Sequence, residues 1–186
     1  MTYERFIREY LDKGLIKKQK PSISAVSKII QWSIKDLQTA VANLSIDEAI
    51  AYSVAYLGML RAGRAYMLLK GFRPSDGFQH KTVVEFMDYS LGETYKNIIS
   101  KFDRMRRKRN IFTYEIDVSI SLTEANNALE TATKFVDLIK DIIKKENPQS
   151  HFEFWFFRDF ISKNKSWQPR LAFIVFLFYL YLRKYW

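Results

Sequence analysis

Cysteine is absent from this chain of 186 residues, and histidine occurs only twice. Without cysteine there can be no disulfide framework and no thiolate zinc site, and two histidines are too few for a histidine-rich metal cluster. We therefore expect neither a metal ion nor another cofactor. The chain also lacks the apolar–polar alternation of a half-buried β-strand, so little sheet is expected.

A secretory signal is missing as well. The first nine residues mix charged and apolar side chains and contain no apolar run of signal-peptide length. We therefore expect a cytoplasmic protein.

Basic residues outnumber acidic ones, 30 to 20, which gives a formal net charge of +10. Such a balance favours an anionic partner, namely nucleic acid, an acidic protein or a membrane surface. A chain of this length accommodates one domain with an appendage.

Helical periodicity dominates the chain and predicts an all-α fold, an antiparallel bundle of four to five helices. A short helix is expected over residues 2–11, then a basic linker over 17–21. Two capping boxes are predicted to open later helices, at residues 45–48 and 121–124. Residues 72–78 are expected to form a loop, and Gly92 to mark a break between helices.

Small residues recur at steps of three and four within one predicted helix. They are Ala51, Ala55, Gly58, Ala62 and Ala65. This spacing places them on one face, where they would let another helix approach closely.

A run of basic residues ends the helix that follows Gly92. Its cations are Arg104, Arg106, Arg107, Lys108 and Arg109, and Asn110 and Tyr114 come next. Because residues four apart share a helix face, we expect Arg109, Asn110 and Tyr114 to converge on one partly exposed site. A guanidinium, an amide and a phenol together suit a phosphodiester. The alternative is a solvated helix end followed by a core tyrosine.

These residues resemble the signature of the HEPN family (higher eukaryotes and prokaryotes nucleotide-binding domains), in which Arg and a polar residue precede His by four to six residues. Arg109 and Asn110 match, but Tyr114 stands where that family has its catalytic histidine. The segments 52–65, 71–74 and 80–86 also resemble HEPN helices and a HEPN loop. The resemblance covers about residues 20–145 and implies a HEPN-like bundle.

By this resemblance, Arg109, Asn110 and Tyr114 would form a catalytic-type site at a homodimer interface, acting on RNA without metal. Arg109 could stabilise developing negative charge. A tyrosine, with an ordinary pKa near 10, is a poor general base at neutral pH, so we expect binding to be better preserved than cleavage. His80 and Lys81 would line the same cleft. Arg104, Arg106, Arg107 and Lys108 would attract the nucleic-acid backbone.

Three hypotheses follow. The first is an RNA- or nucleotide-binding protein with weak or no ribonuclease activity, paired, as the resemblance implies, with a minimal nucleotidyltransferase in a toxin–antitoxin system. The second is a metal-independent endoribonuclease acting through Arg109 and Tyr114. The third is a non-catalytic helical adaptor whose C-terminal tail contacts a membrane or another protein.

The C-terminal segment differs from the rest of the chain. Residues 151–186 hold 14 of the 30 aromatic residues, and residues 171–182 are uninterruptedly apolar. Twelve residues are too few to span a bilayer, which takes about 17 to 25. We therefore expect an aromatic-rich helical extension that closes the core, forms a dimer face or contacts a membrane surface. The predicted organisation is an N-terminal helix and linker (1–20), a HEPN-like bundle (21–147) and this extension (148–186).

Overall fold

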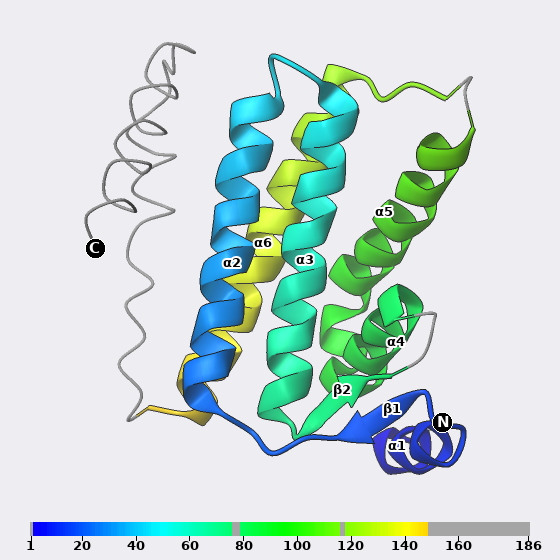
Figure 1. Ribbon diagram of the computed structural model, residues 1–186, viewed down its shortest axis with the longest axis vertical. Helices are drawn as coiled ribbons and strands as arrows, with labels where there is room; N and C mark the ends of the chain where they lie inside the picture. The colour runs from blue at the N-terminus through cyan, green and yellow to red at the C-terminus, as the bar shows by residue number, and fades with distance from the viewer. Residues whose placement is uncertain (1, 76–78, 116–117, 149–186) are drawn as a thin grey trace. The chain divides into compact units, whose positions relative to one another are not determined.

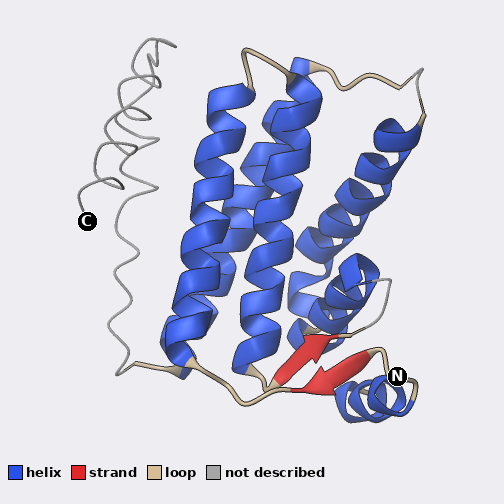
Figure 2. Cartoon of the chain, viewed as in Figure 1, coloured by secondary structure: helices blue, strands red, loops and turns tan. Residues whose placement is uncertain are grey.

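The computed structural model describes residues 2–75, 79–115 and 118–148, and Figures 1 and 2 show how their elements are arranged. Helices make up most of this part of the chain. In chain order the elements are α1 (Tyr3–Asp12), β1 (Ile16–Lys18), α2 (Ile23–Asn43), α3 (Glu48–Leu69), β2 (Phe72–Pro74), α4 (Gln79–Leu91), the 3-10 turn η1 (Glu93–Tyr95), α5 (Lys96–Tyr114) and α6 (Leu122–Glu146).

Helices α2, α3 and α6 form the centre of the described region, with α6 behind the antiparallel pair α2 and α3 (Figure 1). The stripe of small residues on α3 is buried, as predicted. At Gly58 an added Cβ would lie 3.2 Å from both Leu37 Cδ2 and the Ser33 carbonyl oxygen. The Ser33 hydroxyl donates a 2.7 Å hydrogen bond to the Gly58 carbonyl. Glycine here therefore permits close contact between α2 and α3.

Helix α4 packs against α3 on another side. An added Cβ on Gly63 would lie only 2.7 Å from Val83 Cγ1, and Val83 is itself fully buried and stiff about χ1. This contact holds the start of α4, which carries His80, close to α3.

Two short strands correct the sequence prediction for residues 17–21 and 72–78, which were expected to be linker and loop. β1 and β2 pair antiparallel, with Lys17 opposite Arg73. Gly71, with φ +85, turns the chain out of α3 directly into β2. Strands of three residues are too short to show an alternating pattern, and their pairing joins segments far apart in sequence. Local periodicity therefore carried no sign of them.

One of the two predicted capping boxes is confirmed and one is wrong. Ser121 and Glu124 cap α6 reciprocally. Helix α3, in contrast, is capped by Asp47, whose carboxylate accepts a 2.9 Å hydrogen bond from the Ile50 amide. Residues 45 and 46 stay in a turn at the end of α2, because the Ile46 and Asp47 amides both donate to the Asn43 carbonyl.

The prediction of a predominantly helical fold is confirmed, and the predicted break at Gly92 is present, with φ +71. The count of bundle helices and the HEPN-like arrangement stay predictions. The chain divides into two compact units at residue 152, and the extension predicted over 148–186 lies outside the described residues, apart from its first residue. Within the described ranges, no helix combines the length and the apolar character needed to cross a membrane.

Candidate nucleic-acid interface

Helix α5 is the most basic element of the described chain. Three of its residues, Ile99, Phe102 and Met105, are buried at helical spacing and fix the helix on the rest of the fold. Asp103 is the single acidic residue in its sequence. Its cations therefore lie on the remaining sides of the helix. One side faces α6, a second faces α4, and a third faces the first turn of α4.

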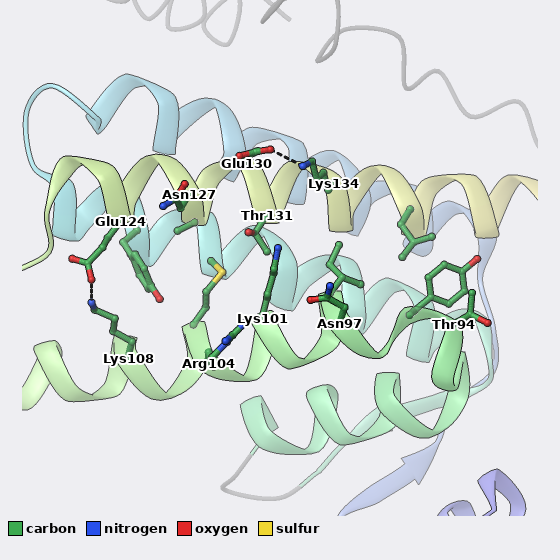
Figure 3. Close-up of a pocket in the computed structure, with 16 residues that line it drawn as sticks. Thr94, Asn97, Lys101, Arg104, Lys108, Glu124, Asn127, Glu130, Thr131 and Lys134 are labelled. Carbon is green, nitrogen blue, oxygen red and sulfur yellow. Dashed lines mark hydrogen bonds and ion pairs between the residues drawn. The ribbon is translucent and has the colours of Figure 1, made fainter.

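The side of α5 that faces α6 borders a groove of about 830 Å³, which we call the α5–α6 groove (Figure 3). Lys101, Arg104 and Lys108 follow the spacing i, i+3, i+7 along it, and Figure 3 shows Lys101 directed toward Thr131. Further polar side chains of α5, α6 and η1 also line it: Asn97, Asn127, Thr131, Lys134 and Thr94. Amides and hydroxyls beside cations are typical ligands of a nucleic-acid backbone.

Some cations of this groove form ion pairs with carboxylates and others do not. Lys108 pairs with Glu124, and Lys134 pairs with Glu130 at 2.5 Å. The hydrogen bond from Lys108, followed by those from Ser121, lowers the pKa of Glu124 to about 2. Neither Lys101 nor Arg104 makes an ion pair with any carboxylate of the described residues. Two positive charges are therefore left available inside the groove.

The side of α5 that faces α4 borders a second groove of about 670 Å³, the α4–α5 groove. In this groove nearly every cation forms an ion pair with a carboxylate. Asp103 accepts from Arg106 at 2.8 Å and from Arg107 at 2.9 Å. Lys96 and Lys81 pair with Asp88 and Glu85, at 2.7 Å and 3.5 Å.

Asp103 is the centre of this neutralisation. Burial tends to raise the pKa of its carboxyl, but hydrogen bonds from Arg107 and Arg106 outweigh burial and hold the pKa below its usual range. Asp103 therefore stays ionised at neutral pH, and both arginines remain paired.

His80 occupies a third location, in the first turn of α4. Its Nδ1 lies 3.0 Å from the buried Tyr56 hydroxyl. Burial, and then the charges of Arg64, Arg109 and Arg106, hold the pKa of His80 below its usual value. The imidazole is therefore neutral at physiological pH, with three guanidinium groups in its surroundings.

The three residues predicted as a catalytic-type site have different environments. Arg109 is half-buried and acts electrostatically on His80. Asn110 is exposed, and Tyr114 is 80% exposed. A separation of five residues places Arg109 and Tyr114 about 140° apart around the helix. The convergence of all three on one ligand stays a prediction.

The predicted nucleic-acid-binding residues divide between the two grooves. Lys81, Arg106 and Arg107 line the α4–α5 groove, Lys108 lines the α5–α6 groove, and Arg104 borders both. Sequence analysis missed the contribution of α6 and of Lys101. The spacing of Lys101 with Arg104 and Lys108 could have indicated that Lys101 belongs to this groove. No local pattern in α6 indicates which helix it faces.

Within the described ranges, no group of three histidine or acidic side chains is placed to hold a metal ion. Comparisons with protein-family models, with curated proteins and with solved structures gave no match. The HEPN resemblance therefore rests on the sequence motifs quoted above, and the argument for function rests on the residues of α5 and their neighbours.

Proposed function

We propose that the protein binds RNA, with the phosphate backbone following the α5–α6 groove. The observation that carries this proposal is the pair Lys101 and Arg104, two cations in one groove that form no ion pair with any described carboxylate. Lys134, Asn97 and Asn127 supply further donors along the same groove.

The physical argument concerns counterions. A free cation that contacts a phosphate releases a condensed counterion into solution, and this release drives association. A cation already bound to a carboxylate must first give up that partner, so it contributes less. The net charge of +10 adds long-range attraction for a polyanion.

Low or absent ribonuclease activity is part of the same proposal. Tyr114 replaces the histidine of the HEPN signature, and a phenol is a weak proton acceptor near pH 7. A homodimer and a minimal nucleotidyltransferase partner are proposed from that resemblance alone. Nucleotidyl transfer to a tyrosine of this site would be compatible with the exposure of Tyr114.

Fluorescence anisotropy with a labelled single-stranded RNA of twelve nucleotides tests the proposal. The test variant is Lys101→Gln/Arg104→Gln, which removes the two free cations. The matched control is Lys96→Gln/Arg107→Gln, which removes two cations of the same helix that are paired with Asp88 and Asp103.

We expect the test variant to lose at least about tenfold in affinity, since two backbone contacts are removed, and the control to lose about threefold or less. Equal losses in both variants would mean that only net charge matters and would reject the groove. Gel analysis of the same RNA in EDTA measures cleavage, and rapid turnover by the wild type would contradict the low-activity proposal.

A further inference from the structure

A cluster of cations surrounds His80 and shares Arg106 with the α4–α5 groove. Arg64 comes from α3, and Arg106 and Arg109 come from α5, and all three act on the same imidazole. Arg106 is neutralised by Asp103, which it shares with Arg107. Among the described carboxylates, none forms an ion pair with Arg64 or Arg109. Two guanidinium charges therefore act on one neutral histidine without forming an ion pair with these residues.

Arg64 also has an unused donor. Its Nη2 donates a 2.7 Å hydrogen bond to the side-chain oxygen of Gln79, but its Nε is buried and has no hydrogen-bond partner. Burial, and the nearby charge of Arg61, lower the pKa of Arg64. A buried donor of a charged group that lacks an acceptor is unfavourable, and an anion bound to the same guanidinium would offset that penalty.

The contact between Tyr56 and His80 determines which imidazole nitrogen of His80 can donate a hydrogen bond. Burial, only partly offset by the nearby arginines, raises the pKa of Tyr56 above its usual value, so the phenol keeps its proton. With Tyr56 donating to Nδ1, the proton of the neutral imidazole resides on Nε2, and His80 can donate from that atom.

These observations share one explanation. We propose that Arg64, His80 and Arg109 bind a terminal phosphate group, the dianionic monoester of a nucleotide or of a 5′-phosphorylated RNA end. Two guanidinium charges without ion pairs match the −1.5 to −2 charge of a monoester near pH 7 better than the single charge of a phosphodiester. The Arg64 guanidinium and the Nε2–H of His80 supply directed hydrogen bonds.

The site is accessible to such a ligand. Arg64, His80 and Arg109 are each half-buried, and Gln79 beside them is exposed. A phosphate can therefore reach these side chains from solvent, and each of them is partly screened from water. Hydrogen bonds to an anion are strengthened by this reduced exposure.

This inference does not rest on RNA binding in the α5–α6 groove. Either proposal can be wrong without the other, because RNA binding in the groove depends on Lys101 and Arg104, whereas the phosphate site depends on Arg64 and His80. A variant that loses its preference for 5′-phosphorylated RNA but keeps its affinity for unphosphorylated RNA separates the two proposals. A variant that keeps this preference but loses the affinity for unphosphorylated RNA does so too.

NMR of the histidine side chain tests the proposal directly. The substitution His151→Gln leaves His80 as the single histidine of the full-length chain. The His80 resonance is followed at pH 7.5 during titration with AMP, with adenosine, and with one RNA sequence carrying either a 5′-phosphate or a 5′-hydroxyl.

We expect a saturable shift with AMP, with the 5′-phosphorylated RNA or with both, and none with adenosine or the 5′-hydroxyl RNA. A bound dianion should also raise the pKa of His80, because it favours the imidazolium. Response to AMP alone identifies a mononucleotide as the source of the phosphate, and response to the RNA end alone identifies RNA. No shift with either phosphate, or equal shifts with and without it, would overturn the site.

Two substitutions of Arg64 separate its charge from its geometry. Arg64→Gln should weaken AMP or RNA-end binding by about tenfold or more. Arg64→Lys keeps the charge but loses the Nε donor and the planar fork, and we expect a loss of about fivefold. Arg8→Gln, an equal charge change on exposed α1, should leave binding unchanged, and unchanged circular dichroism spectra confirm folding. Wild-type affinity in both Arg64 variants would contradict the assignment.

Discussion

The two sides of α5 carry similar numbers of cations but differ in what neutralises them. Toward α4, the carboxylates of Glu85, Asp88 and Asp103 are paired with lysines and arginines. Toward α6, Lys101 and Arg104 have no such partner among the described residues. A basic stretch of sequence therefore overstates the charge that a ligand can use, and the neighbouring helices decide which cations remain available.

The difference has a simple origin in helix spacing. Asp103 lies three and four residues before Arg106 and Arg107, so these pairs form within α5 itself. On α6, Glu130 is similarly used by Lys134 four residues later. Among the described carboxylates of this groove, Glu124 forms an ion pair across it, with Lys108, whereas Glu130 feels the charge of Lys101 without pairing with it. Lys101 and Arg104 therefore stay available.

The largest expected effect of these substitutions comes from adding a carboxylate on the α6 side of α5, so that a cation there is paired as the cations on the α4 side are. The substitution Thr131→Glu places a carboxylate on α6 beside Lys101 (Figure 3). We expect RNA affinity to fall about tenfold, because one free cation becomes paired and a negative charge enters the groove. Anisotropy measures the loss, with Thr131→Gln as the uncharged control of similar size. An unchanged affinity would place the RNA elsewhere.

A smaller effect is expected from the opposite change, which frees cations on the α4 side. Asp103→Asn removes the carboxylate shared by Arg106 and Arg107. Affinity for RNA should rise about threefold to fivefold as these arginines become available for phosphate. The control is Asp137→Asn, an equal charge change at a residue that pairs with Lys140 on α6. If the control raises affinity as much, the pairing around α5 has no special importance.

Glu124→Gln frees Lys108 within the α5–α6 groove and should raise RNA affinity about twofold. Glutamine can still serve in the capping box with Ser121, so the start of α6 should be preserved. Circular dichroism checks this. A decrease in affinity would indicate that Glu124 contacts the ligand favourably.

The same residue gives a prediction for pH. The pKa of Glu124 is lowered to about 2 in the folded protein, mainly by Lys108 and Ser121. A lowered carboxyl pKa stabilises the fold above the ordinary pKa of about 4.5, and that contribution is lost as the pH falls toward 2. Wild type should therefore unfold at higher urea concentration than Glu124→Gln at pH 6, and the difference should disappear near pH 2. A constant difference across this range would contradict the assignment.

The smallest expected effect on binding comes from Tyr114, which is 80% exposed. Tyr114→His should leave RNA affinity within about twofold and the free energy of unfolding within about 0.5 kcal/mol, as for most surface substitutions. It should, however, increase cleavage of RNA in EDTA by restoring a group that transfers protons near pH 7. Cleavage that stays at background shows that the imidazole is not positioned for catalysis.

Much of the helical fold followed from local sequence. The capping box at Ser121 and the break at Gly92 were both predicted, because caps and glycines act over a few residues. The capping box expected at Ser45 was wrong because Asp47, two residues later, competes for the same role. The β1–β2 pair was missed since it depends on a contact across more than fifty residues.

The site was predictable only in part, for a related reason. The sequence shows that α5 is basic and that Arg109 and His80 belong together by resemblance. It does not show that Asp103 neutralises Arg106 and Arg107 while Arg104 stays free, because that depends on side-chain geometry. The position of Arg64 near His80 becomes clear only from its hydrogen bond to Gln79, the residue next to His80.

The salt dependence of RNA binding tests the central claim most directly. The slope of log affinity against log salt concentration counts the phosphates that are neutralised, at about 0.7 for each contact with a single strand. Lys101→Gln/Arg104→Gln should reduce the slope by about 1.4, while Lys96→Gln/Arg107→Gln should leave it within about 0.3 of the wild-type value. Equal reductions in the two variants would contradict the claim that pairing with carboxylates decides which cations of α5 bind RNA.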